Sequence, residues 1–297
     1  MTQANSIVQP ALAVPHQRTG RDALRLVMRS RLIRVGLLIC VPIALVAAVG
    51  PAFMPYDPMA ISIKERLVAP SALHLMGTDN LGRDILSRVI KGARVSFQVG
   101  TVSVVLGLLV GVTLGALAGF IGGALDSVLM RIMDAILAFP GILLALVLVA
   151  VLGRGMIPVM TAVAAIRIPV FARTVRSLVL SEREREYITA ARTLGQHELV
   201  ILVRHIMPNI ISPIIVLGTS YFAQAVVIEA SLSFLGLGVI PPDVSWGTML
   251  NDSRQYMERF PWAPLFPGLA ISAAVLGFNL LGDGLRDVLD PRLRTTL

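Results

Sequence analysis

The sequence is poor in charged and aromatic residues and contains a single cysteine. Of its 297 residues, 15% are charged, 5% are aromatic and only Cys40 carries a thiol, so an intrachain disulfide is excluded. Cys40 lies in an apolar run and is expected to be a small core residue. With 55% hydrophobic residues and a mean hydropathy of +0.78, the chain is too apolar for a soluble domain. It is predicted to be an integral membrane protein.

Motifs for enzyme chemistry are missing. The sequence contains no glycine-rich phosphate loop, no histidine pair at metal-binding spacing and no serine nucleophile elbow. We therefore expect no catalytic residue, no metal and no cofactor in this chain, and any ATPase that drives it must be a separate polypeptide. The net charge of +8 is not gathered with aromatic residues into a basic patch, so a nucleic-acid partner is not expected either.

Six apolar runs are long enough to cross a membrane, which takes roughly 20 residues each. They are Leu32 to Met54, Val95 to Ile121, Val128 to Leu152, Ile157 to Phe171, Asn209 to Phe234 and Pro264 to Val288. The first follows an arginine-rich segment but is too long for a signal peptide and lacks a clear cleavage site. The fold class is therefore an all-α membrane protein with six transmembrane helices.

The distribution of basic residues favours a cytoplasmic N-terminus, because 16 of the 26 then lie on the inner side. This orientation makes 1–31 a cytoplasmic segment, 32–54 the first span and 55–94 an extracytoplasmic segment with an interfacial helix over Arg83 to Arg94. The remaining part, 95–297, holds five spans, a polar loop at 181–208, an external segment at 236–261 with a short helix around Met249 to Arg259, and a cytoplasmic tail at 289–297.

Glycines recur at every fourth position in the second span. They are Gly107, Gly111, Gly115 and Gly119, with Gly123 continuing the series. Such a stripe lets another helix backbone approach closely. Two interpretations stand: packing inside the subunit, or an interface with another subunit that changes between transport states.

Several charged residues lie in or beside the spans. Arg131 and Asp134 are three residues apart and can pair at the end of the third span, with Asp126 nearby. Arg167 and Glu229 lie deeper, where ionisable residues usually have a function or a buried structural partner. Both are candidates for a pathway or gate.

The polar segment from Ser181 to Pro208 interrupts the apolar chain. Its first half has helical spacing, and Gly195 ends that helix because the residue after a helix end often needs positive φ. A second amphipathic stretch follows and ends at Pro208. The prediction is a helix, a hinge and a helix.

This segment resembles the EAA loop of ABC importer permeases. It reads TAARTLG, then QHELVILVR and HIMP, so Ala190, Ala191, Gly195 and Pro208 keep the pattern while Thr189 replaces its glutamate. Further blocks, including HLMGTDNLGRDILSRVIKGARVS, EASLSFLGLGVIPPDVSWGTML and GDGLRDVLDPRLR, are similar to the second permease type of the dipeptide, oligopeptide and nickel branch.

The resemblance implies the type I permease fold in a bacterial inner membrane, with both termini cytoplasmic. It implies a homologous permease as heterodimer partner, two ATPase subunits or domains that bind ATP and magnesium, and an extracytoplasmic substrate-binding protein. The helix from Glu186 to Gly195 would dock in the ATPase as the coupling helix. The expected coupling residues are Glu186, Tyr187, Ala190, Ala191, Leu194 and Gly195.

Alternatives remain for the substrate and for the class of protein, since the composition also allows a structural or assembly scaffold without a pathway. The substrate could be a peptide, a nickel chelate or another small peptide such as glutathione. An ion-gradient transporter acting alone would instead require inverted repeats and buried coupling residues, which the sequence does not display.

Overall fold

The structure is a computed structural model that describes residues 30–289, and every regular element in that range is a helix. The segment 1–29 and the tail from 290 onward, which hold most of the predicted cytoplasmic ends, lie outside the described residues. The elements are α2 (Arg31–Val49), η1 (Gly50–Ala52), η2 (Ile63–Glu65), α3 (Ile85–Ile121), α4 (Gly123–Leu137), α5 (Gly141–Leu152), α6 (Met156–Arg183), α7 (Glu186–Thr193), α8 (Glu198–Val200), the π-helix η3 (Ile201–Ile206), α9 (Met207–Phe234), α10 (Trp246–Ser253) and α11 (Trp262–Leu289).

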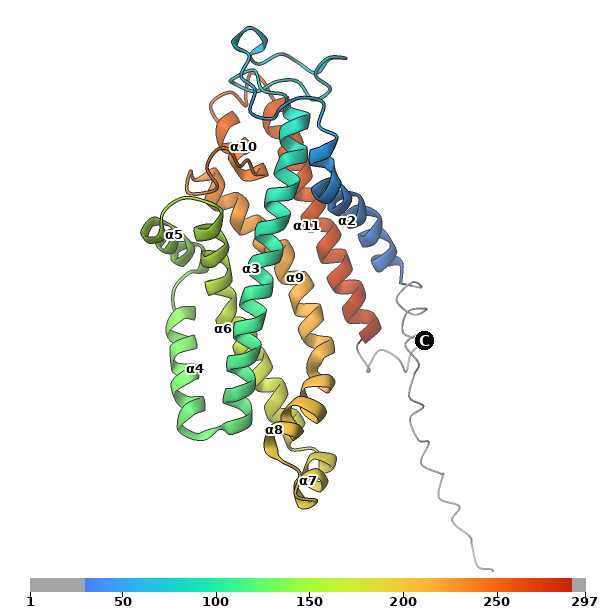
Figure 1. The fold of residues 1–297 in the computed structure, drawn as a ribbon, viewed down its shortest axis with the longest axis vertical. Coiled ribbons are helices and arrows are strands. Elements are labelled where there is room, and N and C mark those ends of the chain that lie inside the picture. Colours follow the sequence, from blue (N-terminus) through green and yellow to red (C-terminus); the bar gives the residue numbers. More distant parts are fainter. Residues whose placement is uncertain (1–29, 290–297) are drawn as a thin grey trace, which may run out of the picture.

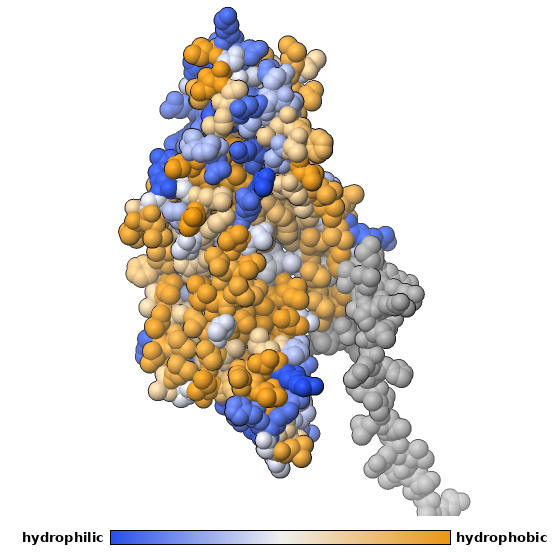
Figure 2. All heavy atoms as spheres, viewed as in Figure 1, coloured by the Kyte–Doolittle hydropathy of each residue, from blue (hydrophilic) through white to orange (hydrophobic). Residues whose placement is uncertain are grey.

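The long helices α3, α6, α9 and α11 run side by side as a bundle, with α2 against α11 (Figure 1). The short helices α7 and α10 lie at opposite ends, here called the α7 end and the α10 end. Among the described residues, five helices are long and apolar enough to cross a membrane, and α4 with α5 can form a sixth span. Figure 2 shows a broad hydrophobic surface between more polar ends, as expected for a bundle surrounded by lipid.

The third predicted span, Val128 to Leu152, is not one straight helix. It consists of α4 and α5, which meet at an angle of 90°. Pro140 is the N-cap of α5, and a proline disfavours the helical conformation in the residue before it, here Phe139. The expectation of a continuous span was therefore wrong because it ignored the proline.

The separate interfacial helix predicted over Arg83 to Arg94 is also wrong. The Asp84 side chain accepts a hydrogen bond from the Ser87 backbone at 2.8 Å and starts α3, which continues unbroken to Ile121. The short external helix exists, but it begins earlier than expected, at Trp246, because Ser245 and Thr248 form a capping box.

Two hydrophobic cores hold the bundle. The larger lies among α3, α6, α9, α10 and α11 and includes the stacked rings of Phe222 and Phe278, whose centroids are 3.9 Å apart. The smaller joins α3, α6 and α9 to the α7 end through Ile188, Ile201 and Ile206, all fully buried. The second core is what fixes α7 to the spans.

Candidate functional site

The polar segment between α6 and α9 has the predicted form of helix, hinge and helix. Helix α7 ends at Thr193, and Gly195 has a φ of +75°, a conformation that glycine adopts at little cost. The return helix differs from expectation, because α8, η3 and α9 continue through Pro208 to Phe234 without a break. Proline is tolerated near the start of α9, where η3 has already shifted the regular hydrogen-bond pattern.

Helix α7 presents one face to the bundle and the other to solvent. Ile188, which the sequence analysis did not single out, is fully buried in the smaller core, and Ala191 packs beside it. Glu186, Ala190 and Tyr187 are exposed, and Leu194 is 87% exposed. Of the predicted coupling residues, Ala191 therefore attaches α7 to the spans, while Glu186, Ala190 and Leu194 can meet a partner.

Tyr187 links three elements at the base of this segment. Its hydroxyl donates to Glu182 Oε1 of α6 at 2.5 Å and accepts from Asn209 Nδ2 of α9 at 2.9 Å. Partial burial, followed by the bond to Glu182, raises the pKa of Tyr187 above its usual value. The hydroxyl thus remains a donor at neutral pH and connects α7 to both helices that flank it.

A double-mutant cycle tests this link. Tyr187→Phe and Asn209→Ala are expected to be coupled by about 0.5 kcal/mol in the free energy of unfolding, because each removes one partner of the same hydrogen bond. The measurement is denaturant unfolding in detergent. Thr193→Val is the matched control, since its hydroxyl bonds only to Thr189 of the same helix. Additive effects of Tyr187→Phe and Asn209→Ala would refute the link.

The glycine stripe of α3 packs inside the subunit, against α6. A Cβ on Gly111 would lie 2.5 Å from Phe171 Cβ, and one on Gly119 would lie 2.8 Å from the Arg176 carbonyl oxygen. Gly107 faces Ala164 and Arg167 in the same way, and Gly115 touches the Ala172 carbonyl oxygen most closely of all. Of the two interpretations of the stripe, the structure supports packing within the chain. Gly123 is not part of it: it is the first residue of α4, with a φ of +61°, and an added Cβ there would meet no atom within 4 Å.

The charged residues near the third span pair differently from the prediction. Asp134 pairs with Arg173, and Asp126 accepts two hydrogen bonds from Arg176 at 2.5 and 2.6 Å. The predicted pair of Arg131 with Asp134 is wrong, because the Asp134 carboxylate bonds to Arg173 of α6 instead. These ion pairs hold α4 against α6, a contact that spacing along one helix could not reveal.

Arg167 and Glu229 are both buried in the bundle. The Arg167 guanidinium lies 4.8 Å from the ring centroid of Tyr221, a cation–π contact. Glu229 is fully buried, and its two carboxylate oxygens accept hydrogen bonds from Ser233 at 2.7 Å and Ser96 at 3.2 Å. Their suggested role in a pathway or gate stays a prediction.

The Glu229 cluster also holds helix α10. Ser245, the N-cap of α10, donates to Ser233, and the Trp246 backbone donates to Ser96. Glycines permit this close contact, because a Cβ on Gly247 would lie 2.6 Å from Ala230 of α9. Glu229 thus connects α3, α9 and α10, although from sequence it had no identifiable partner.

A second polar cluster at the α10 end was missed by the sequence analysis. Arg83 bonds to Asp79 at 2.7 Å and to Asp252 at 2.9 Å, and Arg88 bonds to the same Asp252 oxygen at 2.8 Å. The cluster ties the start of α3 to the end of α10. It also neutralises Arg83 and Arg88, two of the basic residues that oppose the charge-based orientation.

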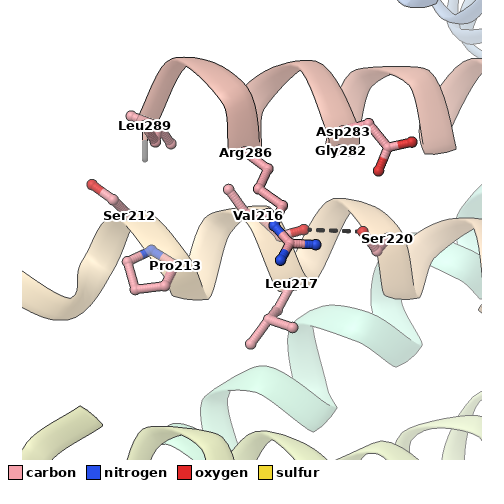
Figure 3. A pocket seen from close by; sticks show the side chains of 9 residues that line it. All are labelled: Ser212, Pro213, Val216, Leu217, Ser220, Gly282, Asp283, Arg286 and Leu289. Carbon is pink, nitrogen blue, oxygen red and sulfur yellow. Dashed lines mark hydrogen bonds between the residues drawn. The ribbon is translucent and has the colours of Figure 1, made fainter. Parts of the chain in front are cut away.

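A groove of about 510 Å³ lies between α9 and α11, toward the α7 end. Figure 3 shows Arg286 of α11 extending across this groove toward Val216 and Leu217 of α9. Asp283 lines the same groove. Nothing in the sequence analysis had selected these residues, apart from the resemblance of the block that contains them.

Comparison with known proteins identifies the family. Residues 111–295 match the family described as "Binding-protein-dependent transport system inner membrane component". The chain is 44% identical to the dipeptide transport system permease protein DppC of Alkalihalophilus pseudofirmus, over 93% of this chain and 90% of that protein. It is 45% identical to the glutathione transport system permease protein GsiD of Pectobacterium atrosepticum, over 89% and 87% of the two chains.

A solved structure supports the fold. A chain of the MetNI methionine ABC transporter, in an inward-facing conformation, superposes with a TM-score of 0.56 at 18% identity, covering 69% of this chain and 97% of that one. The fold is therefore that of an ABC importer permease. By sequence and by architecture, this chain belongs to the family of binding-protein-dependent transport system inner membrane components.

Proposed function

We propose that this chain is one permease subunit of an ABC importer that moves short peptides across the bacterial inner membrane. The peptide assignment rests on relatives named for dipeptides and glutathione, itself a short peptide. Family membership favours this function over the ion-gradient transporter considered above. A homologous permease completes the pathway, two ATPase subunits or domains supply the energy, and an extracytoplasmic binding protein delivers the peptide.

The observation that carries the mechanism is the attachment of α7. Its exposed face, with Leu194, is free to enter a cleft of an ATPase, while Ile188 and Tyr187 tie its other face to α6 and α9. Movement of an ATPase that grips α7 is then transmitted to both spans. A loop without these attachments would absorb the movement.

In this proposal the α7 end is cytoplasmic and the α10 end is extracytoplasmic. The orientation follows the distribution of basic residues, of which 16 of 26 then lie on the cytoplasmic side, and it brings the α7 segment to the same side as the ATPases. ATP binding closes the ATPases, tilts α7 and opens the cavity between the permeases outward. Hydrolysis returns the cavity to the inward-open state.

Two variants of the α7 segment test this coupling. Leu194→Glu places a charge on the docking face and is expected to lower recovery of the ATPase subunits with the permease at least about tenfold, because a buried charge costs far more than the lost contact.

Gly195→Val meets no neighbouring atom within 4 Å but forces a β-branched residue to a φ of +75°, so we expect the ATPases to bind while peptide uptake per ATP falls.

The measurements are co-purification and ATP-driven peptide uptake in proteoliposomes that contain the complete transporter. Ile61→Glu, at a position 62% exposed at the opposite end, is the control for an added surface charge. The proposal fails if Leu194→Glu retains its ATPases and Gly195→Val transports at the normal ratio. Uptake driven by an ion gradient without ATPases would overturn the function itself.

A further inference from the structure

The groove between α9 and α11 continues beyond the cavity shown in Figure 3. A second cavity of about 260 Å³ lies farther along the same two helices, toward the α10 end. Its lining includes Gln224 of α9 and Asn279 of α11, and the first cavity adds Ser212 and Ser220. One groove therefore follows the seam of two membrane-spanning helices over much of their length.

Polar side chains on this groove are exposed where lipid would be a poor neighbour. Gln224 and Asn279 are exposed on the surface of the chain, yet each lies well inside a predicted span. An amide without a partner in hydrocarbon costs several kcal/mol. This face of the bundle is therefore turned toward water or another protein rather than toward lipid tails.

Two opposite charges lie at the α7 end of the groove. Asp283 and Arg286 are one helical turn apart on α11, both exposed, and neither forms an ion pair or a side-chain hydrogen bond with another described residue. Other charges near span ends are used in packing, as shown by Asp126 with Arg176. Asp283 and Arg286 hold no helices together, and Arg286 extends over the groove (Figure 3).

We propose that this groove is the wall that the chain contributes to the translocation pathway, and that Asp283 and Arg286 bind the charged ends of a peptide at its cytoplasmic mouth. The inference rests on the proposed function. A free peptide carries an ammonium group and a carboxylate, which Asp283 and Arg286 complement, and arginine can hold a carboxylate through two parallel hydrogen bonds. Farther along the groove, the hydroxyls of Ser212 and Ser220 and the amides of Gln224 and Asn279 suit the peptide backbone.

Thiol labelling tests whether the groove contains water. In the complete transporter with Cys40→Ala, Val216→Cys and Gln224→Cys are expected to react with a membrane-impermeant cationic methanethiosulfonate reagent. Ile215→Cys and Leu276→Cys are matched controls, because both native residues are exposed and adjacent to groove positions but do not line it. Equal or absent reaction at all four positions would mean that lipid or a partner helix fills the groove, and would overturn the pathway assignment.

The role of the two charges is tested with modified peptides. ATP-driven uptake is measured for trialanine, its C-terminal amide and its N-acetyl derivative. Arg286→Gln is expected to change the ratio of trialanine to amide uptake about tenfold, and Asp283→Asn to change the ratio of trialanine to acetylated peptide by a similar factor, as expected for loss of one charge-assisted hydrogen bond. Each variant is the control for the other's peptide.

These ratios are compared within one variant, so they do not depend on the amount of assembled transporter. The binding protein affects wild type and variant equally, so a changed ratio belongs to the permease. Unchanged ratios with active transport would refute binding of the termini by Asp283 and Arg286. If the complete wild-type transporter takes up none of these peptides, the proposed function is refuted instead. The labelling result would still decide whether the groove is a water-filled pathway.

Discussion

Gly115→Ala is expected to lower the free energy of unfolding by about 2 kcal/mol, although it adds a single methyl group. The Cβ would overlap the Ala172 carbonyl oxygen and also lie 3.0 Å from the Ala172 Cα. Both are backbone atoms of α6 and cannot rotate away. The two helices would have to separate along the seam that Gly107, Gly111 and Gly119 extend.

The same substitution at Gly268 is the matched control. Gly268 lies inside α11, and an added Cβ there meets no atom within 4 Å. Alanine should therefore be neutral or stabilise by about 0.5 kcal/mol, because it restricts the unfolded chain more than glycine does. Unfolding is followed by circular dichroism in mixed micelles. Equal effects at the two positions would show that the α3–α6 seam tolerates separation.

Glu229→Ala is expected to destabilise the α10 end by about 3 kcal/mol and to release α10 from the bundle. The substitution removes the acceptor of Ser96 and Ser233 and leaves a cavity in a fully buried site. Trp246 is held by the same network, because its backbone N–H donates to Ser96. Its indole also donates to the Val89 carbonyl at 3.0 Å. Its side chain, now 2% exposed, should become accessible.

Fluorescence quenching by acrylamide reports this release when Trp262→Phe leaves Trp246 as the sole tryptophan. Glu229→Gln keeps the shape of the side chain and one acceptor oxygen, so acrylamide should quench Trp246 less in this variant than in Glu229→Ala. Ser231→Ala is the control on the same helix, since its exposed hydroxyl bonds only to the Val227 carbonyl. If Trp246 remains shielded in Glu229→Ala, the carboxylate does not hold α10 in place.

Some expectations failed because they treated charges and helices one segment at a time. Asp134 pairs with Arg173 across two helices rather than with Arg131 along one, and Arg88 is neutralised by Asp252, which lies 164 positions away. Pairing of this kind is set by which helices become neighbours. Local spacing carries no information about it.

Other expectations succeeded because a short stretch of chain determines the structure. Gly195 ends α7 through its own positive φ, and the spans follow from run length and hydropathy. The family could likewise be identified from the sequence, because its motifs are continuous stretches of the chain. The sequence did not predict that Leu194 of α7 is exposed while Ile188 is buried, because this division depends on where the smaller core lies.

The sequence by itself determined the membrane class, most of the spans, the α7 segment and the family, since each depends on composition or on residues close together. Only the tertiary structure decided that the glycine stripe of α3 seals against α6, that Glu229 holds α10, and that Gln224, Asn279, Asp283 and Arg286 share one groove. The physical reason is common to all three. Helix packing brings together side chains that are distant in the chain, and the packing partner of an apolar helix is not encoded in its own periodicity.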